Sequence, residues 1–172
     1  MKQIFLTLSI LIGIGLQAQS GTFGSIPDAR VKTLDGRTFQ TAQLDNDGKP
    51  MVISMWATWC KPCIRELSAI QDMYFDWQEQ TGVKIVAVSI DDARNASKVG
   101  PFVNGEGWEY EVYIDENQDF KRLLNVNTIP HTFLVNGKGE IVWQHNGYAA
   151  GDEDELYDLI VKLAAGETIG DH

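Results

Sequence analysis

Two patterns of apolar residues alternate along the chain and predict an α/β fold. Short, almost continuously apolar runs occur at 51–57 and 83–90, as is typical of strands buried on both faces. Between them, apolar residues recur every three or four positions, which predicts a helix with one buried face. This stripe consists of Ile64, Leu67, Ile70, Met73, Tyr74 and Trp77. Gly82 follows it, where a glycine commonly ends a helix. The order predicts a parallel βαβ unit.

Shorter elements are predicted on both sides of this unit. Asp35-Gly36 and Asn136-Gly137-Lys138-Gly139 are turn signals, each between two apolar runs, and predict two hairpins. Asp91-Asp92 can cap a helix, and we expect Gly100-Pro101 to break or kink it. The predicted elements are a hairpin of 29–34 and 37–39, a helix from 91 to about 103, a strand at 110–114, a helix at 116–124, a hairpin of 131–135 and 141–144, and a helix from 152.

The two predicted C-terminal helices should each turn one side to the core. Helix 116–124 is expected to bury Phe120, Leu123 and Leu124. The last helix has acids in its first turn, which suits the positive end of the helix dipole. Its buried stripe is Leu156, Leu159, Ile160, Leu163 and Ala164. Residues 104–107 are expected to be a loop, and 20–27 an extended and mobile leader.

Residues 1–20 predict a secretory signal. Lys2 gives a basic start, residues 4–16 are mostly apolar, and Ala18 and Ser20 are small residues suited to cleavage after either one. This apolar stretch is short for a membrane-spanning helix, although an uncleaved anchor is the alternative. We therefore expect an exported, periplasmic protein with one domain over residues 21–172.

The acidic composition argues against two classes of partner. The chain has 172 residues, a formal net charge of −10 and 44% hydrophobic residues. Nucleic acids and anionic membranes both require a basic face, so neither is expected as a partner. The length suits one well-buried domain, and we expect a monomer.

The only two cysteines, Cys60 and Cys63, stand where the first buried strand meets the predicted helix. A helix start favours a thiolate, because unpaired backbone N–H groups and the positive end of the dipole lie there. A second thiol three residues on is within reach to resolve a mixed disulfide. These features predict a redox-active disulfide and no other cofactor. A metal site would need two more ligands, of which His131 could supply one, so no metal is expected.

A motif around the cysteines resembles the thioredoxin superfamily. It reads Trp56-Ala57-Thr58-Trp59-Cys60-Lys61-Pro62-Cys63, with Ile129-Pro130 downstream and the order βαβ then ββα. The signal segment, the N-terminal hairpin, the inserted segment around 92–108 and Glu66 are most similar to the exported TlpA/ResA-like branch. The resemblance covers about residues 25–166. It implies a thioredoxin-like fold, with a central mixed β-sheet flanked by helices, an N-terminal β-hairpin and an inserted helical segment, and thiol–disulfide oxidoreductase activity.

The resemblance also implies roles for the motif residues. Cys60 corresponds to the attacking thiol and Cys63 to the buried resolving thiol. Lys61 should favour the Cys60 thiolate. Pro62 fits the first helical turn, where its missing N–H costs nothing. Trp59 is expected to form a partly exposed platform beside Cys60.

Glu66 lies three residues after Cys63 and therefore on the same helix face. In the branch it resembles, a glutamate here accepts the proton of the resolving cysteine. Burial against the sheet would raise its pKa toward the working range, as this role requires. Ser54 stands where thioredoxin has a buried aspartate, and a hydroxyl cannot act as that base. The alternative for Glu66 is a solvated acid paired with a nearby cation.

Pro130 corresponds to a cis-proline that faces the cysteine pair in this superfamily. A cis bond there would present the backbone of Ile129 for strand-like pairing with an extended substrate. His131 follows directly and has two interpretations. It could tune Cys60 or touch the substrate, or its ring could be hydrogen-bonded within the sheet.

Residue spacing separates the functions that this fold could serve. A peroxiredoxin needs Pro and Thr where this chain has Ile53 and Ala57. A Sco-type copper module has Cys-x-x-x-Cys, and a non-catalytic interaction domain normally lacks one cysteine. We therefore expect a protein disulfide reductase, with a dithiol oxidant or a copper-binding module as alternatives. Its expected partners are exported proteins with disulfides, apocytochrome c among them, and a membrane electron donor.

Overall fold

The structure, a computed structural model, describes residues 23–169. Its strands are β1 (Arg30–Thr33), β2 (Thr38–Gln40), β3 (Met51–Trp56), β4 (Lys84–Ser89), β5 (Glu111–Ile114), β6 (His131–Val135) and β7 (Ile141–Asn146). Its helices are the 3-10 helix η1 (Thr41–Gln43) and the α-helices α1 (Lys61–Thr81), α2 (Ala96–Glu106), α3 (Asp119–Leu123) and α4 (Asp152–Ala164). The predicted signal segment lies outside the described residues.

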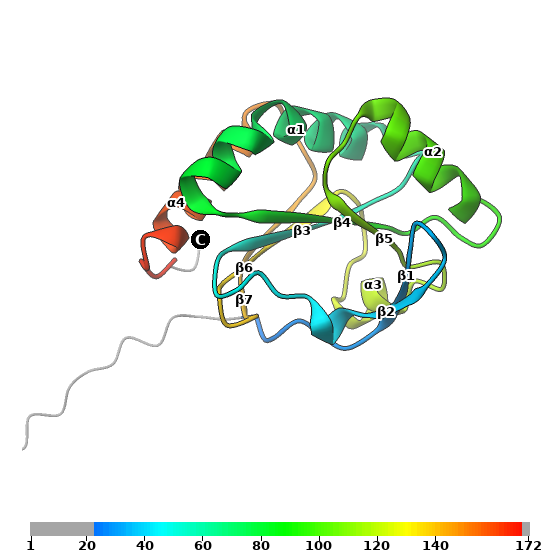
Figure 1. The fold of residues 1–172 in the computed structure, drawn as a ribbon, viewed down its shortest axis with the longest axis horizontal. Helices are drawn as coiled ribbons and strands as arrows, with labels where there is room; N and C mark the ends of the chain where they lie inside the picture. The colour runs from blue at the N-terminus through cyan, green and yellow to red at the C-terminus, as the bar shows by residue number, and fades with distance from the viewer. Residues whose placement is uncertain (1–22, 170–172) are drawn as a thin grey trace, which may run out of the picture.

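A mixed seven-stranded sheet in the order β2-β1-β5-β4-β3-β6-β7 forms the centre of the molecule. Figure 1 shows α1 and α2 over one face of this sheet and α3 beneath the other. Helix α4 lies beside α1, and the pair covers the end of the sheet that carries β6 and β7. The predicted α/β class is confirmed.

The predicted central βαβ unit is confirmed as well. Every residue of β3 is buried, and β4 runs parallel to it, with Met51 opposite Lys84 and Trp56 opposite Ser89. Between the two strands, α1 ends at Gly82, whose φ of 68° is left-handed. Strand β6 runs antiparallel on the other side of β3 and pairs Thr132 with Ser54. The start of β6 is thereby held against the carboxyl end of β3.

The connection from β4 through α2 to β5 differs from the prediction. Helix α2 begins at Ala96, so Asp91 does not cap it, and Pro101 lies inside a helix that continues to Glu106. A proline in a helix interior removes one hydrogen bond. Buried Val99 and Val103 pack this helix on the core, and this burial outweighs the lost bond.

Two smaller predictions about burial are also wrong. Leu123 and Ala164 are exposed rather than buried, because α3 and α4 end at or just after these residues. The segment at 23–27, predicted to be extended, pairs with the sheet. Phe23 N donates to Ile141 O (2.9 Å), and Ser25 forms a bridge with Glu140, so this segment extends the sheet edge at β7. Among the described helices, none combines the length and apolarity that a membrane span needs.

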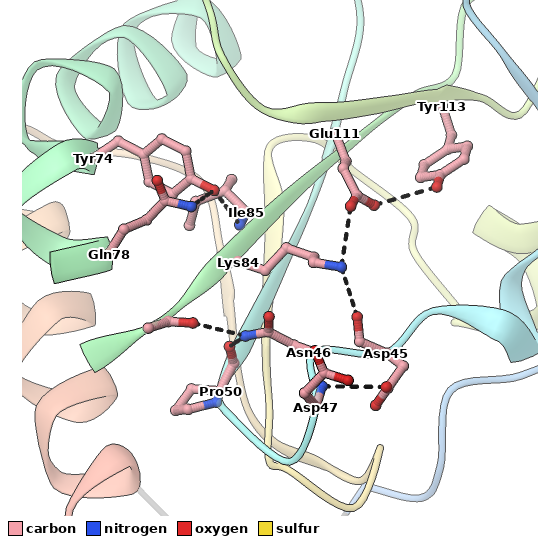
Figure 2. Close-up of polar contacts among 11 residues, drawn as sticks. Asp45, Asn46, Asp47, Pro50, Tyr74, Gln78, Lys84, Ile85, Glu111 and Tyr113 are labelled. Carbon is pink, nitrogen blue, oxygen red and sulfur yellow. Dashed lines mark hydrogen bonds and ion pairs between the residues drawn. The ribbon is translucent and has the colours of Figure 1, made fainter. Parts of the chain in front are cut away.

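Polar contacts stabilise the end of the sheet where β4 begins, away from the cysteines. Figure 2 shows Lys84, the first residue of β4, between Glu111 (3.1 Å) and the carbonyl oxygen of Asp45 (2.7 Å). On the α1 side, the Tyr74 hydroxyl accepts from the backbone N–H of Ile85 at 3.3 Å. These contacts tie β4 to its neighbours and leave the carboxyl ends of the strands free for the site.

A close backbone contact in the β6–β7 turn gives a stability prediction. A Cβ added at Gly137 would overlap the carbonyl oxygen of Gly48, so Gly137→Ala should destabilise the fold by about 1–3 kcal/mol. Gly105→Ala in α2 is the matched control, because its added Cβ meets no heavy atom within 4 Å. It should be neutral or stabilising by up to about 1 kcal/mol. Urea unfolding measures both, and equal responses would contradict the prediction.

Candidate active site

The cysteine pair sits where β3 ends and α1 begins. Cys60 is the N-cap of α1, and its backbone N–H donates to the carbonyl oxygen of Ala57 at 3.0 Å, which forms a tight turn out of the strand. The Cys63 backbone N–H lies 3.3 Å from the Cys60 sulfur. The two cysteines form a disulfide with their Cα atoms 5.3 Å apart. Any negative charge that develops on Cys60 would therefore face the helix N-terminus.

Exposure around the pair follows the predicted order. Cys63 is fully buried, Cys60 is 5% exposed, and Trp59 beside it is 63% exposed. Lys61 is also exposed, and Pro62 lies in the first turn of α1. The Cys60 sulfur is thus the one nearer the surface, flanked by an aromatic ring and a cation.

Asp91 supports the loop before Cys60, a role that the sequence interpretation missed. Its carboxylate accepts hydrogen bonds from the backbone N–H of Thr58, the Thr58 hydroxyl and the Ser89 hydroxyl, each at 2.8 Å. The side chain is fully buried at the carboxyl end of β4. An acid that directly follows a buried strand was the available signal. Its place before a predicted helix favours a helix cap instead, but Asn95 is the N-cap of α2.

Glu66 is buried between α1 and the sheet, with only 5% of its surface exposed. The Thr132 hydroxyl on β6 donates to one carboxylate oxygen at 2.6 Å, and the Ser54 hydroxyl on β3 donates to the other at 3.2 Å. The alternative of a solvated helix acid is therefore wrong. Ser54 is not a base itself, but it helps to hold the buried carboxylate.

Burial raises the pKa of Glu66 from its usual 4.5 to about 7. The two hydroxyl groups act in the opposite direction because they stabilise the carboxylate, while the charges of Asp152 and Glu153 add to the effect of burial. A carboxyl group with this pKa can exchange a proton near neutral pH.

The segment before β6 lies near Trp59, because Ile129 and Trp59 line the same pocket. The Ile129–Pro130 peptide bond is cis, as the resemblance implies, and Pro130 is buried. His131 is hydrogen-bonded within the sheet: its Nε2 lies 2.9 Å from Gln144 Oε1 and its ring stacks on Phe133. Burial lowers the pKa of His131, which favours the neutral ring. These contacts fit the second of its two interpretations.

A pocket next to Trp59 is lined by residues from four segments. Trp59 and Ile129 line it with Ile90, the residue that follows β4. Lys121 of α3 and the loop residues Asn127 and Thr128 complete the lining. An apolar side chain next to a substrate cysteine could enter this space. The described residues contain no cluster of three His, Cys, Asp or Glu side chains arranged as a metal site.

Comparisons with known proteins match this geometry. Residues 24–144 match the model of the AhpC/TSA family. The chain is 36% identical over 117 residues to the thiol-disulfide oxidoreductase ResA of Oceanobacillus iheyensis, covering 67% of this chain and 59% of that protein. It is 32% identical over 131 residues to ResA of Bacillus thuringiensis, covering 76% of this chain and 73% of that protein.

A solved structure extends the likeness to three dimensions. An uncharacterized thioredoxin-like protein from Porphyromonas gingivalis superposes with a TM-score of 0.75 at 51% sequence identity. The match covers 88% of this chain and 97% of the other. The thioredoxin-like fold that the motif implies is therefore confirmed.

The burial of Glu66 predicts how stability depends on pH. Its pKa of about 7 in the folded protein exceeds the usual 4.5, so folding favours the protonated form. This contribution is full below about pH 4.5 and is lost as the pH rises through about 7. Glu66→Gln removes the titration, so its stability relative to wild type should rise by about 3 kcal/mol between these pH values.

Urea unfolding of the oxidised protein across this pH range measures the difference. Glu79→Gln on the exposed face of α1 is the matched control and should show no such trend. A constant difference between Glu66→Gln and wild type would show that Glu66 does not titrate in this range.

Proposed function

The chain belongs to the AhpC/TSA family and is a thiol–disulfide oxidoreductase of the ResA type, and from this premise we propose that it reduces disulfides of exported proteins outside the cytoplasm. The observation that carries this proposal is the buried Glu66 carboxyl group beside a cysteine pair at a helix start. The secretory pattern of residues 1–20 supports the compartment.

The first step is attack by Cys60. In the reduced protein, the Cys60 thiolate attacks one sulfur of the partner disulfide, and the other partner sulfur leaves as a thiolate. A mixed disulfide between Cys60 and the partner results. The N-terminus of α1 and Lys61 stabilise the attacking thiolate. The partner segment docks in the pocket that Trp59 and Ile129 line, next to Pro130.

The second step releases the partner. The Glu66 carboxylate accepts the proton of the Cys63 thiol, and the Cys63 thiolate then attacks the Cys60 sulfur of the mixed disulfide. The second partner sulfur leaves, and the Cys60–Cys63 disulfide forms. Two electrons have passed from the dithiol to the partner. The Glu66 carboxyl group, which accepts a hydrogen bond from the Thr132 hydroxyl and has a pKa of about 7, suits this proton transfer near neutral pH.

A reductase in an oxidising compartment needs a source of electrons. We propose a membrane electron-donor protein that regenerates the dithiol by exchange with its own cysteine pair. Exported proteins whose cysteines must stay reduced are the substrate class, and apocytochrome c is one candidate. The acidic surface favours partners without large negative charge.

The direction of transfer predicts the reduction potential. We expect the Cys60–Cys63 pair to have a midpoint at or below about −250 mV, within the range of thioredoxin. Tryptophan fluorescence in graded thiol buffers can follow the transition, because Trp56 and Trp59 closely precede the pair in the sequence. A midpoint near about −120 mV would indicate an oxidant and overturn the direction. Absence of any redox transition would contradict the function and favour the copper-binding alternative.

The role of Glu66 predicts a selective loss of rate. Glu66→Gln should slow release from the mixed disulfide about 10- to 100-fold at pH 7, because no carboxylate accepts the Cys63 proton. Stopped-flow reduction of a disulfide peptide measures this rate, and alkylation across pH should show a shifted apparent pKa of Cys63. Glu79→Gln is the control and should match wild type. Unchanged rate and titration in Glu66→Gln would remove Glu66 from the mechanism.

A further inference from the structure

A cation, Lys121 of α3, lines the pocket next to Trp59. The apolar residues of the lining are Trp59, Ile90 and Ile129. The volume of the pocket is about 270 Å³, which is below the roughly 300–1,000 Å³ of sites that hold whole small-molecule ligands. The pocket therefore suits single side chains of a docked protein segment.

Hydrogen bonds at both ends hold Lys121 in this position. Its backbone N–H donates to the buried Asp115 carboxylate at 2.9 Å. Its ammonium group donates to Gln118 Oε1 at 3.1 Å, and Nε2 of the same amide donates to the carbonyl oxygen of Ile90 at 3.3 Å. Ile90 lines the pocket, so the Gln118 amide connects the ammonium group of Lys121 to the pocket wall.

The carboxylates closest to Lys121 along the chain and at the end of β4 have other partners. Both oxygens of Asp115 accept backbone N–H groups at 2.9 Å. Asp119 forms an ion pair with Arg122, and the buried Asp91 accepts three hydrogen bonds. The ion pairs within residues 23–169 do not include Lys121. An ammonium group has three N–H donors, so Lys121 keeps donors for a bound partner.

This cation differs from the rest of an acidic molecule. The chain has a formal net charge of −10, yet the pocket places an ammonium group without a carboxylate beside apolar residues. A carboxylate that arrives there would gain a charge-assisted hydrogen bond, strengthened by the water that the apolar residues exclude. A cationic side chain would be repelled at the same place.

We propose that Lys121 selects partners that carry an aspartate or glutamate close to the cysteine that Cys60 attacks. The inference rests on the proposed function, in which a partner segment docks in this pocket. An apolar side chain of the segment packs on Trp59 and Ile129, and the nearby carboxylate accepts from Lys121. One local carboxylate is compatible with partners of low overall negative charge. Lys121 is a specificity-determining residue and takes no part in the thiol exchange.

The test offers acidic and neutral peptides to the same protein sample. All peptides share one sequence with a single cysteine, held as a mixed disulfide with the uncharged thiol 2-mercaptoethanol. Each pair differs by Glu against Gln at one of the three positions before or after that cysteine. In reduced Cys63→Ala, the Cys60 thiolate attacks the peptide sulfur and mercaptoethanol leaves as a thiolate. The peptide stays bound because no resolving thiol is present, and mass spectrometry measures which peptide was captured.

For at least one position, we expect the Glu peptide to be captured about 3- to 10-fold more often than its Gln partner. This preference should decrease as salt is added, because salt screens the ion pair. In the same Cys63→Ala protein, Lys121→Met keeps an apolar stem without the charge and should abolish the preference. Lys121→Arg should retain the preference, and Lys121→Glu should reverse it toward peptides with Lys at that position.

Lys98→Met is the matched control. The Lys98 ammonium group also donates to an amide oxygen three residues earlier, that of Asn95 at 2.8 Å, but Lys98 does not line the pocket. This variant should keep the full preference for the Glu peptide. Equal capture of Glu and Gln peptides at every position, or a preference that survives Lys121→Met, would overturn the proposal.

Reduction by the protein with both cysteines separates this inference from the proposed function. Stopped-flow measurement of the reduced protein should show the same preference in the second-order rate constant of the first step. Equal rates for both peptides would overturn the role of Lys121 and leave the reductase function standing. Selective capture without net reduction would support selection by Lys121 and contradict the proposed direction. Absence of both capture and reduction would contradict the proposed function and the inference with it.

Discussion

Burial of the Glu66 carboxyl group is the constraint on which the arrangement of the site depends. A carboxyl group taken out of water is costly unless hydrogen-bond donors meet its oxygens. Two strands supply these donors, Ser54 from β3 and Thr132 from β6, and α1 brings the carboxyl group to them. The register of β3 and β6 pairs the two hydroxyl residues directly. The pairing of β3 with β6 and the position of α1 therefore together determine the proton chemistry of Glu66.

The start of α1 is fixed from the opposite side by a second buried acid. Asp91 at the end of β4 binds Thr58 through its backbone and its hydroxyl, so the chain leaves β3 along one path. Cys60 then caps α1, and Cys63 falls one turn below it. Parallel pairing of β3 and β4 brings Asp91 to this place, because the carboxyl ends of both strands lie at one sheet edge.

Much of the fold and of the candidate site could be predicted because their signals are local. Apolar strand runs, the helical stripe and turn glycines predicted the βαβ unit and both hairpins, and the motif placed Cys60 and Cys63 at a helix start. The errors arose where long-range packing competes with a local preference. Gly100-Pro101 predicted a break or a kink, and no break occurs, because burial of Val99 and Val103 keeps α2 continuous. Asp91 suited a helix cap, yet it points to a loop 33 residues earlier.

The sequence by itself determined which chemistry is available: a cysteine pair at a strand–helix junction and a carboxyl group on the same helix face. These follow from residue identity and helical spacing, which act over a few positions. Only the tertiary structure decided the environment of that carboxyl group. Residues 54, 66 and 132 meet through sheet register and helix packing. Burial and charge depend on these distant neighbours, so the pKa of Glu66 is a property of the fold.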